Sequence, residues 1–202
     1  MKSDAFLAIW SDVSAENEVD YLHWLTREHT AERLSVDGFR AVRVYRSLDE
    51  GVCRYLIHYD LASSAVLDSE SYLRRLNAPT PWSQRIMPIL GTFIRGGGQV
   101  SNAFGTGHAG VLGAVRFAAH PYPDATALQS IAGRDLIVAA RLLETDTDRT
   151  TVQTKEKGMR ERDTTFAALL LVEGLKEQAV REALTYAELG APAELFRQVF
   201  QL

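Results

Sequence analysis

The sequence predicts an α+β protein in which two tandem ferredoxin-like (βαββαβ) repeats close into one intramolecular α/β barrel of the dimeric type. Residues 1–100 read as strand, helix, strand, strand, helix, strand, and residues 108–202 repeat that order. Such a unit carries helices on one face of its sheet and leaves the other face bare. Two joined units can cover each other's bare faces. The repeat therefore predicts a barrel with a pocket between its sheets, with the pocket in the first half and the second half closing it.

The first half contains four predicted strands and two helical stretches. Alternating or continuously apolar runs predict strands at residues 6–10, 39–48, 52–61 and 92–97. Helical spacing predicts helices at residues 14–36 and 63–90, the second interrupted by two prolines. Val19, Leu22, Thr26 and His29 form one stripe of the first helix, so we expect that stripe to face the sheet. Asp37-Gly38 ends that helix, since Gly is the usual residue after a helix C-terminus.

The second half repeats this order with shorter connections. Strands are predicted at residues 111–119, 136–143, 166–172 and 193–202, and helices at residues 123–133 and 176–186. Two segments fall outside these elements. Residues 96–110 are rich in glycine and predict a flexible joint, because they lack the Lys-Ser/Thr pair of a phosphate-binding loop. Residues 145–163 are charged and lack apolar periodicity, so a solvated hairpin extension is expected there.

Composition excludes several classes of function. A net charge of −4 and a pI near 5.8 argue against a nucleic-acid partner, which requires a basic face. The apolar run at the N-terminus is too short for a signal peptide or a membrane span. Cys53 is the single cysteine, so no internal disulfide can form. These features predict a soluble cytoplasmic protein without a membrane partner.

The first helix carries the densest group of chemically versatile side chains. His29 and Arg33 lie one turn apart, and a group that titrates near neutral pH beside a fixed cation can act as base and electrophile. The alternative is a helix end with ordinary salt-linked charges. His23 and His29 are six residues apart rather than three or four, so a shared metal site is not expected. No cofactor motif stands out either.

The strands provide a second group of candidates. Arg43 and Tyr45 share one face of the second strand, and an arginine in a buried sheet must be paired or face a wet cavity. That face is therefore the predicted pocket wall. His58 on the third strand has no such assignment, since strand alternation does not say which face is inside. Core packing is the alternative for all the aromatic side chains.

Four segments resemble a bacterial group of dimeric α/β-barrel proteins related to the EthD-like proteins. They are WLTREHTAERL (residues 24–34), GFRAVRVYRSLD (38–49), RYLIHYDL (54–61) and NAPTPWSQRI (77–86). The sequence departs from the usual pattern at Leu25, Thr26 and Ala31, where the group has Tyr, Asp and Pro. The resemblance covers about the first 95 residues, and the second half matches none of these motifs.

The resemblance implies a small-molecule ligand in an apolar cavity, and the absence of a metal-binding motif favours chemistry without a metal. Members of the wider superfamily include cofactor-free monooxygenases, cyclases, isomerases and haem-degrading enzymes. The leading hypothesis is an enzyme acting on an aromatic or polyketide-like carbonyl compound. In it, His29 is the general acid or base, and Arg33 or Arg43 holds an enolate or carboxylate. Trp24, Tyr45 and Trp82 shape the cavity, with His58 as a further substrate-binding residue. A non-catalytic ligand-binding protein and a haem-binding oxygenase stay open as alternatives, as does homodimerisation of the tandem chain.

Overall fold

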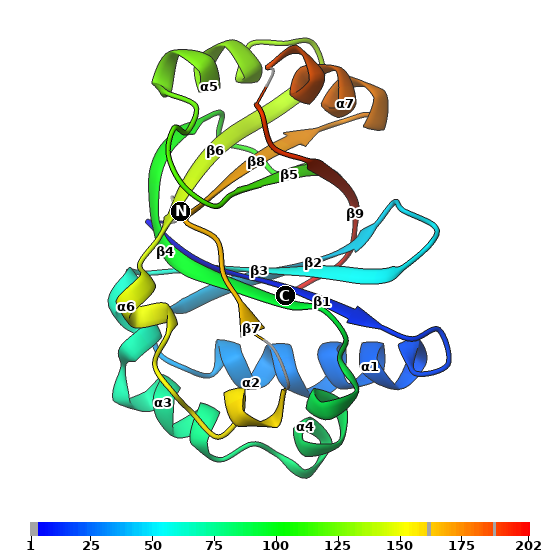
Figure 1. Ribbon diagram of the computed structural model, residues 1–202, viewed down its shortest axis with the longest axis vertical. Helices are drawn as coiled ribbons and strands as arrows, with labels where there is room; N and C mark the ends of the chain where they lie inside the picture. Colours follow the sequence, from blue (N-terminus) through cyan, green and yellow to red (C-terminus); the bar gives the residue numbers. More distant parts are fainter. Residues whose placement is uncertain (1–3, 161–162, 188) are drawn as a thin grey trace.

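Eight antiparallel strands form a closed barrel. The computed structural model describes residues 4–160, 163–187 and 189–202. The strand order is β1-β3-β2-β9-β5-β8-β6-β4, and β4 pairs back onto β1 (Figure 1). The barrel strands are β1 (Ala5–Val13), β2 (Phe39–Ser47), β3 (Cys53–Leu61), β4 (Phe93–Phe104), β5 (Val111–Phe117), β6 (Ile137–Thr145), β8 (Ala168–Gly174) and β9 (Ala193–Gln201). The predicted α+β class and α/β barrel are confirmed.

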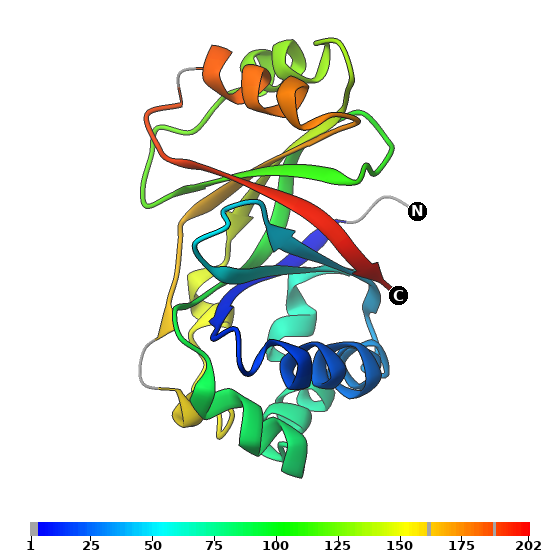
Figure 2. The ribbon, with the colours of Figure 1, turned by 90° about the vertical axis from the view of Figure 1, so that its right-hand side faces the viewer.

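The strands of each half lie in the same order. In the first half that order is β4-β1-β3-β2, and in the second half it is β9-β5-β8-β6. The halves join at two antiparallel seams, β2–β9 and β4–β6. Figure 2 shows β9 running between the two helical layers to the C-terminus, beside the hairpin of the first half.

Helices cover the barrel on two opposite sides (Figure 1). The first half contributes α1 (Glu18–Trp24), α2 (Thr30–Leu34), α3 (Glu70–Asn77) and α4 (Pro81–Ile86), and the second contributes α5 (Ala125–Ala132) and α7 (Glu177–Tyr186). Short 3-10 turns occupy Ser64–Asp68, Met87–Ile89 and Lys157–Met159. Each helical layer buries its own apolar cluster against the outer face of its sheet, and a third cluster fills part of the barrel interior. Both faces of most strands are therefore buried, which explains their long apolar runs.

A π-helical turn, Leu25–His29, joins α1 to α2. Up to the start of the turn the buried residues are Tyr21, Trp24 and Leu25. A regular α-helix would next bury Glu28 and Glu32, but the wider turn rotates the buried face by one residue to His29 and Arg33. The predicted stripe is therefore correct at His29 and wrong at Val19, which is 65% exposed.

The glycine-rich stretch is largely strand rather than a flexible joint. β4 extends through Gly96, Gly97 and Gly98, all of them buried. A Cβ atom on Gly96 would overlap the ring of Phe166, and one on Gly98 would overlap the Glu144 carbonyl. These glycines let β4 pass close to its neighbours, which is a packing requirement that composition alone does not reveal.

The polar stretch after β6 crosses the barrel to the helices of the first half. We call residues 146–160 and 163–165 the crossing segment; it contains α6 (Thr147–Thr150) and β7 (Asp163–Thr164), which pairs parallel to β4. In Figure 1 it lies beside α2, α3 and α4. The backbone N–H of Glu156 donates to the carbonyl of Leu76, at 3.0 Å. The expected extension does connect the antiparallel strands β6 and β8, but it is anchored rather than solvated. Its anchoring contacts are polar, so they give no apolar periodicity. Residues 161–162 of the predicted stretch lie outside the described residues.

Candidate functional site

A cavity of about 300 Å³ lies inside one end of the barrel. Its walls come from both halves, and the third apolar cluster forms its floor. The lining residues are Arg43, Tyr45, His58, Asp60, Val100, Ala103, Gly105, Thr106, His108, Arg141, Leu143, Leu171 and Glu173. Three residues predicted for the pocket, Arg43, Tyr45 and His58, therefore line one cavity. The pocket is shared between the halves rather than confined to the first.

The first half contributes an arginine, a carboxylate and a histidine to this cavity. Arg43 Nη2 donates to both carboxylate oxygens of Asp60, at 2.8 and 2.7 Å. Burial alone would raise the pKa of Asp60, but His58 and Arg43 outweigh burial and lower it. Asp60 is therefore ionised, and it offsets the charge of an arginine that is only 6% exposed.

His58 is the buried titratable group of the cavity. Its Nδ1 lies 3.5 Å from Asp60 Oδ1, and its Nε2 has no hydrogen-bond partner among the described residues. Burial lowers the pKa of His58 to about 4, against the opposing charge of Asp60. The ring stacks on Phe6, with 6.4 Å between centroids. His58 is thus neutral near pH 7, and its Nε2 is a buried nitrogen with no partner among the described residues.

The second half contributes a matching arginine and carboxylate. Arg141 Nη1 forms an ion pair with Glu173, whose other contacts are the His108 imidazole and the Ala109 N–H, at 3.1 and 2.9 Å. Burial would raise the pKa of Glu173, but these neighbours lower it. Sequence reasoning missed this group. The available signal was Glu173 itself, an acid at the end of the apolar strand LLLVEG.

The two arginine–carboxylate pairs occupy one register. Arg43 lies opposite His58, two residues before Asp60, and Arg141 lies opposite Leu171, two residues before Glu173. In each half, the arginine is on the second strand and the acid is on the third. Strand alternation then points all four side chains to the same side of the sheet, into the barrel.

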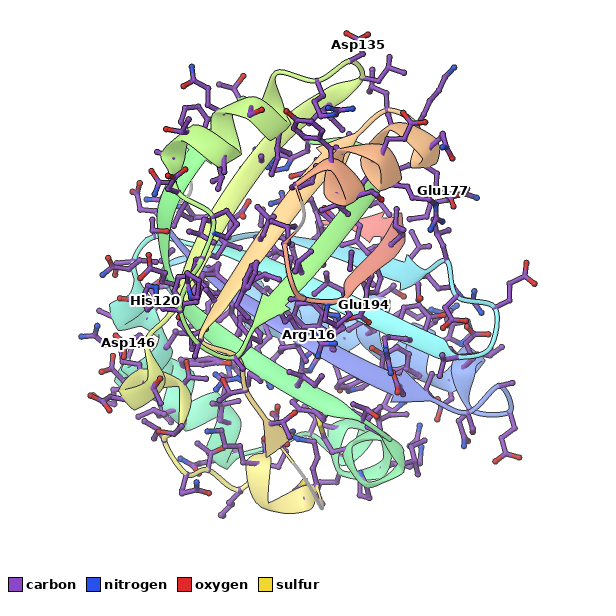
Figure 3. The ribbon with its side chains drawn as sticks, turned by 45° about the horizontal axis from the view of Figure 1, so that its top comes forward. Arg116, His120, Asp135, Asp146, Glu177 and Glu194 are labelled. Carbon is purple, nitrogen blue, oxygen red and sulfur yellow. The ribbon has the colours of Figure 1, made fainter. Side chains whose placement is uncertain are left out.

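The far end of the barrel is closed by ion pairs. Arg54 binds Asp12 at 2.7 Å and Glu194 at 3.0 Å, and Arg116 binds the other oxygen of Glu194. Figure 3 shows Arg116 and Glu194 together at that end, on neighbouring strands. The Arg116 guanidinium also lies 4.9 Å from the ring centre of Trp10. The cavity is therefore entered from the end that carries His108.

His29 and Arg33 lie elsewhere, on the helical side of the first-half sheet. They border a void of about 20 Å³, which has room for about one water molecule but not for an aromatic ligand. Burial lowers the pKa of His29 well below its ordinary value, as do Arg33 and Arg160. Arg33 forms an ion pair with Glu156 of the crossing segment. The sequence-predicted candidates are thus divided between two places, and His29 and Arg33 do not reach the barrel cavity.

Trp24 and Trp82 hold α4 against the first helix. Trp24 Nε1 donates to Ser83 Oγ at 3.1 Å, and Trp82 Nε1 donates to Asp20 at 3.0 Å. Thr80 caps α4 and donates to Glu28 at 2.6 Å. Much of the motif NAPTPW therefore packs one helix on another, and neither tryptophan lines the barrel cavity.

Neither place fits a haem group in this conformation. The void beside His29 is too small, and the cavity beside His58 is at the lower end of the ~300–1,000 Å³ typical of drug-sized ligands. Its entrance is also lined by two ion pairs rather than by apolar faces that would suit a macrocycle. Among the described residues, no three His, Cys, Asp or Glu side chains are grouped to bind a metal ion. No described helix has the length and apolar character to span a membrane.

The strand order and the helical layers define a closed α/β barrel, and several solved structures share this fold. An anthrone oxidase-like protein superposes with a TM-score of 0.62 and 10% identity, covering 100% of this chain and 93% of that protein. A putative monooxygenase from Fusobacterium nucleatum superposes with a TM-score of 0.56 and 10% identity, covering 100% of this chain and 95% of that one.

A putative chlorite dismutase superposes with a TM-score of 0.53 and 10% identity, covering 98% of this chain and 96% of that protein. At such identities the likeness concerns the fold alone. Neither a protein-family model nor a curated protein matches the sequence. The resemblance to EthD-like proteins stays a prediction.

Proposed function

We propose that the barrel cavity binds a small aromatic or polyketide-like compound that carries an enolisable carbonyl or a carboxylate. The observation that carries this proposal is the meeting of two arginine–carboxylate pairs and a neutral imidazole in an otherwise apolar interior. A guanidinium has five N–H donors, and Asp60 engages only Nη2 of Arg43. Donors that remain beside an apolar floor suit a ligand with an apolar body and one or two oxygen atoms.

In the catalytic form of this proposal, His58 and the two arginines act on one ligand. A ring nitrogen of His58 accepts a proton from the carbon beside the carbonyl, and Asp60 stabilises the imidazolium that forms. Arg43 or Arg141 holds the enolate oxygen that develops as the C–H bond breaks. The putative monooxygenase and the anthrone oxidase-like protein share the fold, which supports small-molecule chemistry as the class to test first.

A non-catalytic binding protein is the second candidate. The pKa of about 4 for His58 favours it, because so weak a base transfers protons slowly unless the bound ligand raises that pKa. We further propose that residues 1–100 and 108–202 are tandem ferredoxin-like units, as the shared strand order supports. A cytoplasmic location and an EthD-like relationship belong to the same proposal.

The experiment is a thermal-shift screen of the purified chain against phenols, quinones, aromatic acids and lactones. Ala103 lines the cavity from β4, and Ala103→Trp should fill it and abolish the shift. Gln99→Trp, at an exposed position of the same strand, is the matched control and should leave the shift unchanged. A shift that survives Ala103→Trp places the ligand elsewhere and overturns the proposal. Product formation that is lost in His58→Gln, with binding retained, would distinguish an enzyme from a binding protein.

A further inference from the structure

A second cavity lies between β4 and the crossing segment, outside the barrel. It measures about 390 Å³ and is lined by Arg95, Thr150, Thr151, Gln153, Lys157, Gly158, Arg160, Asp163, Thr164 and Thr165. Apart from Arg95, every one of these residues belongs to the crossing segment. Cations, hydroxyls and an amide dominate this lining, in contrast to the apolar floor of the barrel cavity.

Two cations of this cavity share one backbone acceptor. Arg95 Nη1 donates to the carbonyl of Thr150 at 2.7 Å, and Lys157 Nζ donates to the same oxygen at 2.6 Å. Arg95 is only 7% exposed. Within the described residues, no carboxylate forms an ion pair with either side chain. A neutral carbonyl oxygen does not balance two positive charges, so this corner of the cavity carries an excess of positive charge.

The surroundings do not remove that excess. Arg160 donates two hydrogen bonds of 2.8 Å to Asp163, so the charges of these two side chains neutralise each other. Burial, together with the charges of Arg95 and Arg160, lowers the pKa of Lys157 to about 8, and only Asp163 opposes this. The Thr150 carbonyl itself is held in place, because Thr150 Oγ1 donates to the carbonyl of Gly97 at 2.9 Å. Arg95 and Lys157 therefore donate to a carbonyl oxygen whose position is fixed.

We propose that Arg95 and Lys157 bind a small oxyanion, a phosphate or carboxylate group, in the cavity beneath the crossing segment. Guanidinium and ammonium groups form charge-assisted hydrogen bonds with such oxygens, and both side chains have N–H donors besides the one that each gives to the Thr150 carbonyl. The anion would link β4 to the crossing segment and would thereby stabilise the folded chain. This site is separate from the barrel cavity, and its test is independent of the ligand proposed there.

The test titrates the full chain with inorganic phosphate, and in a second arm with malonate, at an ionic strength held constant with sodium chloride. We expect the thermal midpoint to rise with one of the two anions and not with chloride. Lys157→Gln should weaken the anion's affinity about tenfold or more, since it removes one charge-assisted bond. Lys155→Gln, at an exposed position of the same segment, is the matched control and should bind normally.

Two results would overturn the proposal. One is a midpoint that responds to phosphate and malonate no more than to chloride. The other is an affinity that Lys157→Gln leaves unchanged. Arg95→Gln is the second variant, with its folding checked first by circular dichroism because Arg95 is buried. A rise of the thermal midpoint with phosphate indicates a phosphate ligand, and a rise with malonate indicates a carboxylate ligand.

Discussion

Arg43 and Arg141 occupy the same register position in the two halves of the barrel, and each binds the acid that lies two residues beyond its partner on the neighbouring strand. The acids differ in their other contacts. Among the described residues, Asp60 has besides Arg43 only the His58 imidazole at 3.5 Å, whereas Glu173 also accepts from His108 and from the Ala109 N–H. The two ion pairs therefore have the same position in the two halves, but Glu173 has more hydrogen-bond partners than Asp60.

This difference predicts unequal costs of removing each arginine. Arg43→Met should lower the free energy of unfolding by about 3 kcal/mol, because it leaves a partly buried carboxylate without its ion pair. Arg141→Met should cost less, because Glu173 keeps two partners. Urea denaturation measures both values. Arg43→Met combined with Asp60→Leu should recover most of the loss, and equal losses for the two single variants would contradict the argument.

The pKa of His58 predicts a dependence of stability on pH. The folded value of about 4 lies below the ordinary value of 6.5, so the unfolded chain binds more protons between these two pH values. Stability should therefore fall as the pH drops from 6.5 toward 4, with His58 contributing on the order of 3 kcal/mol. Denaturation midpoints of His58→Gln across this range should show a shallower slope than those of the unmodified chain. His23→Gln serves as the control and should keep the full slope.

Glu156 should anchor the crossing segment to the helices of the first half. Glu156→Ala leaves Arg33, which is 2% exposed, without its buried partner, and should cost about 3 kcal/mol or more in unfolding free energy. It should also speed limited proteolysis within the crossing segment. Lys155→Ala, at the exposed neighbouring position, should change neither quantity. Unchanged proteolysis in Glu156→Ala would show that other contacts hold the segment.

A side chain at Gly98 should destabilise the fold, because its Cβ atom would clash with backbone atoms. A Cβ atom there would overlap the Glu144 carbonyl and come within 2.7 Å of the Asp146 nitrogen, and neither backbone atom can move without breaking the β4–β6 seam. Gly98→Ala should cost about 3 kcal/mol or more, at or above the usual upper range for overpacking. Gly110→Ala, with no atom within 4 Å of its Cβ, should be nearly neutral when both are compared by thermal denaturation.

Local rules were sufficient to predict much of the fold and part of the site. Helical and strand periodicity located most elements, and the cost of burying Arg43 correctly identified its strand face as a cavity wall. Strand periodicity could not tell which side of a sheet becomes the barrel interior, so it left open the face on which His58 lies. The π turn illustrates a further limit, because a single wider turn decides whether Glu28 or His29 is buried.

Other parts depend on contacts between residues far apart in the chain. Glu156 reaches Arg33, and the glycines of β4 meet Phe166 and Glu144, through packing that has no local signature. Polar side chains on the crossing segment were expected to be solvated, and the structure buries Thr150, Thr154 and Glu156. Arg141 and Glu173 were visible as an arginine and an acid on apolar strands, but only the register of β6 with β8 brings them together.

Both seams of the barrel, β2–β9 and β4–β6, join strands of the same polypeptide. Closure is therefore a unimolecular event whose equilibrium does not depend on protein concentration, unlike that of a barrel assembled from two chains. Dilution to nanomolar levels leaves the cavity walls from the two halves together, so a ligand meets a complete cavity at any expression level.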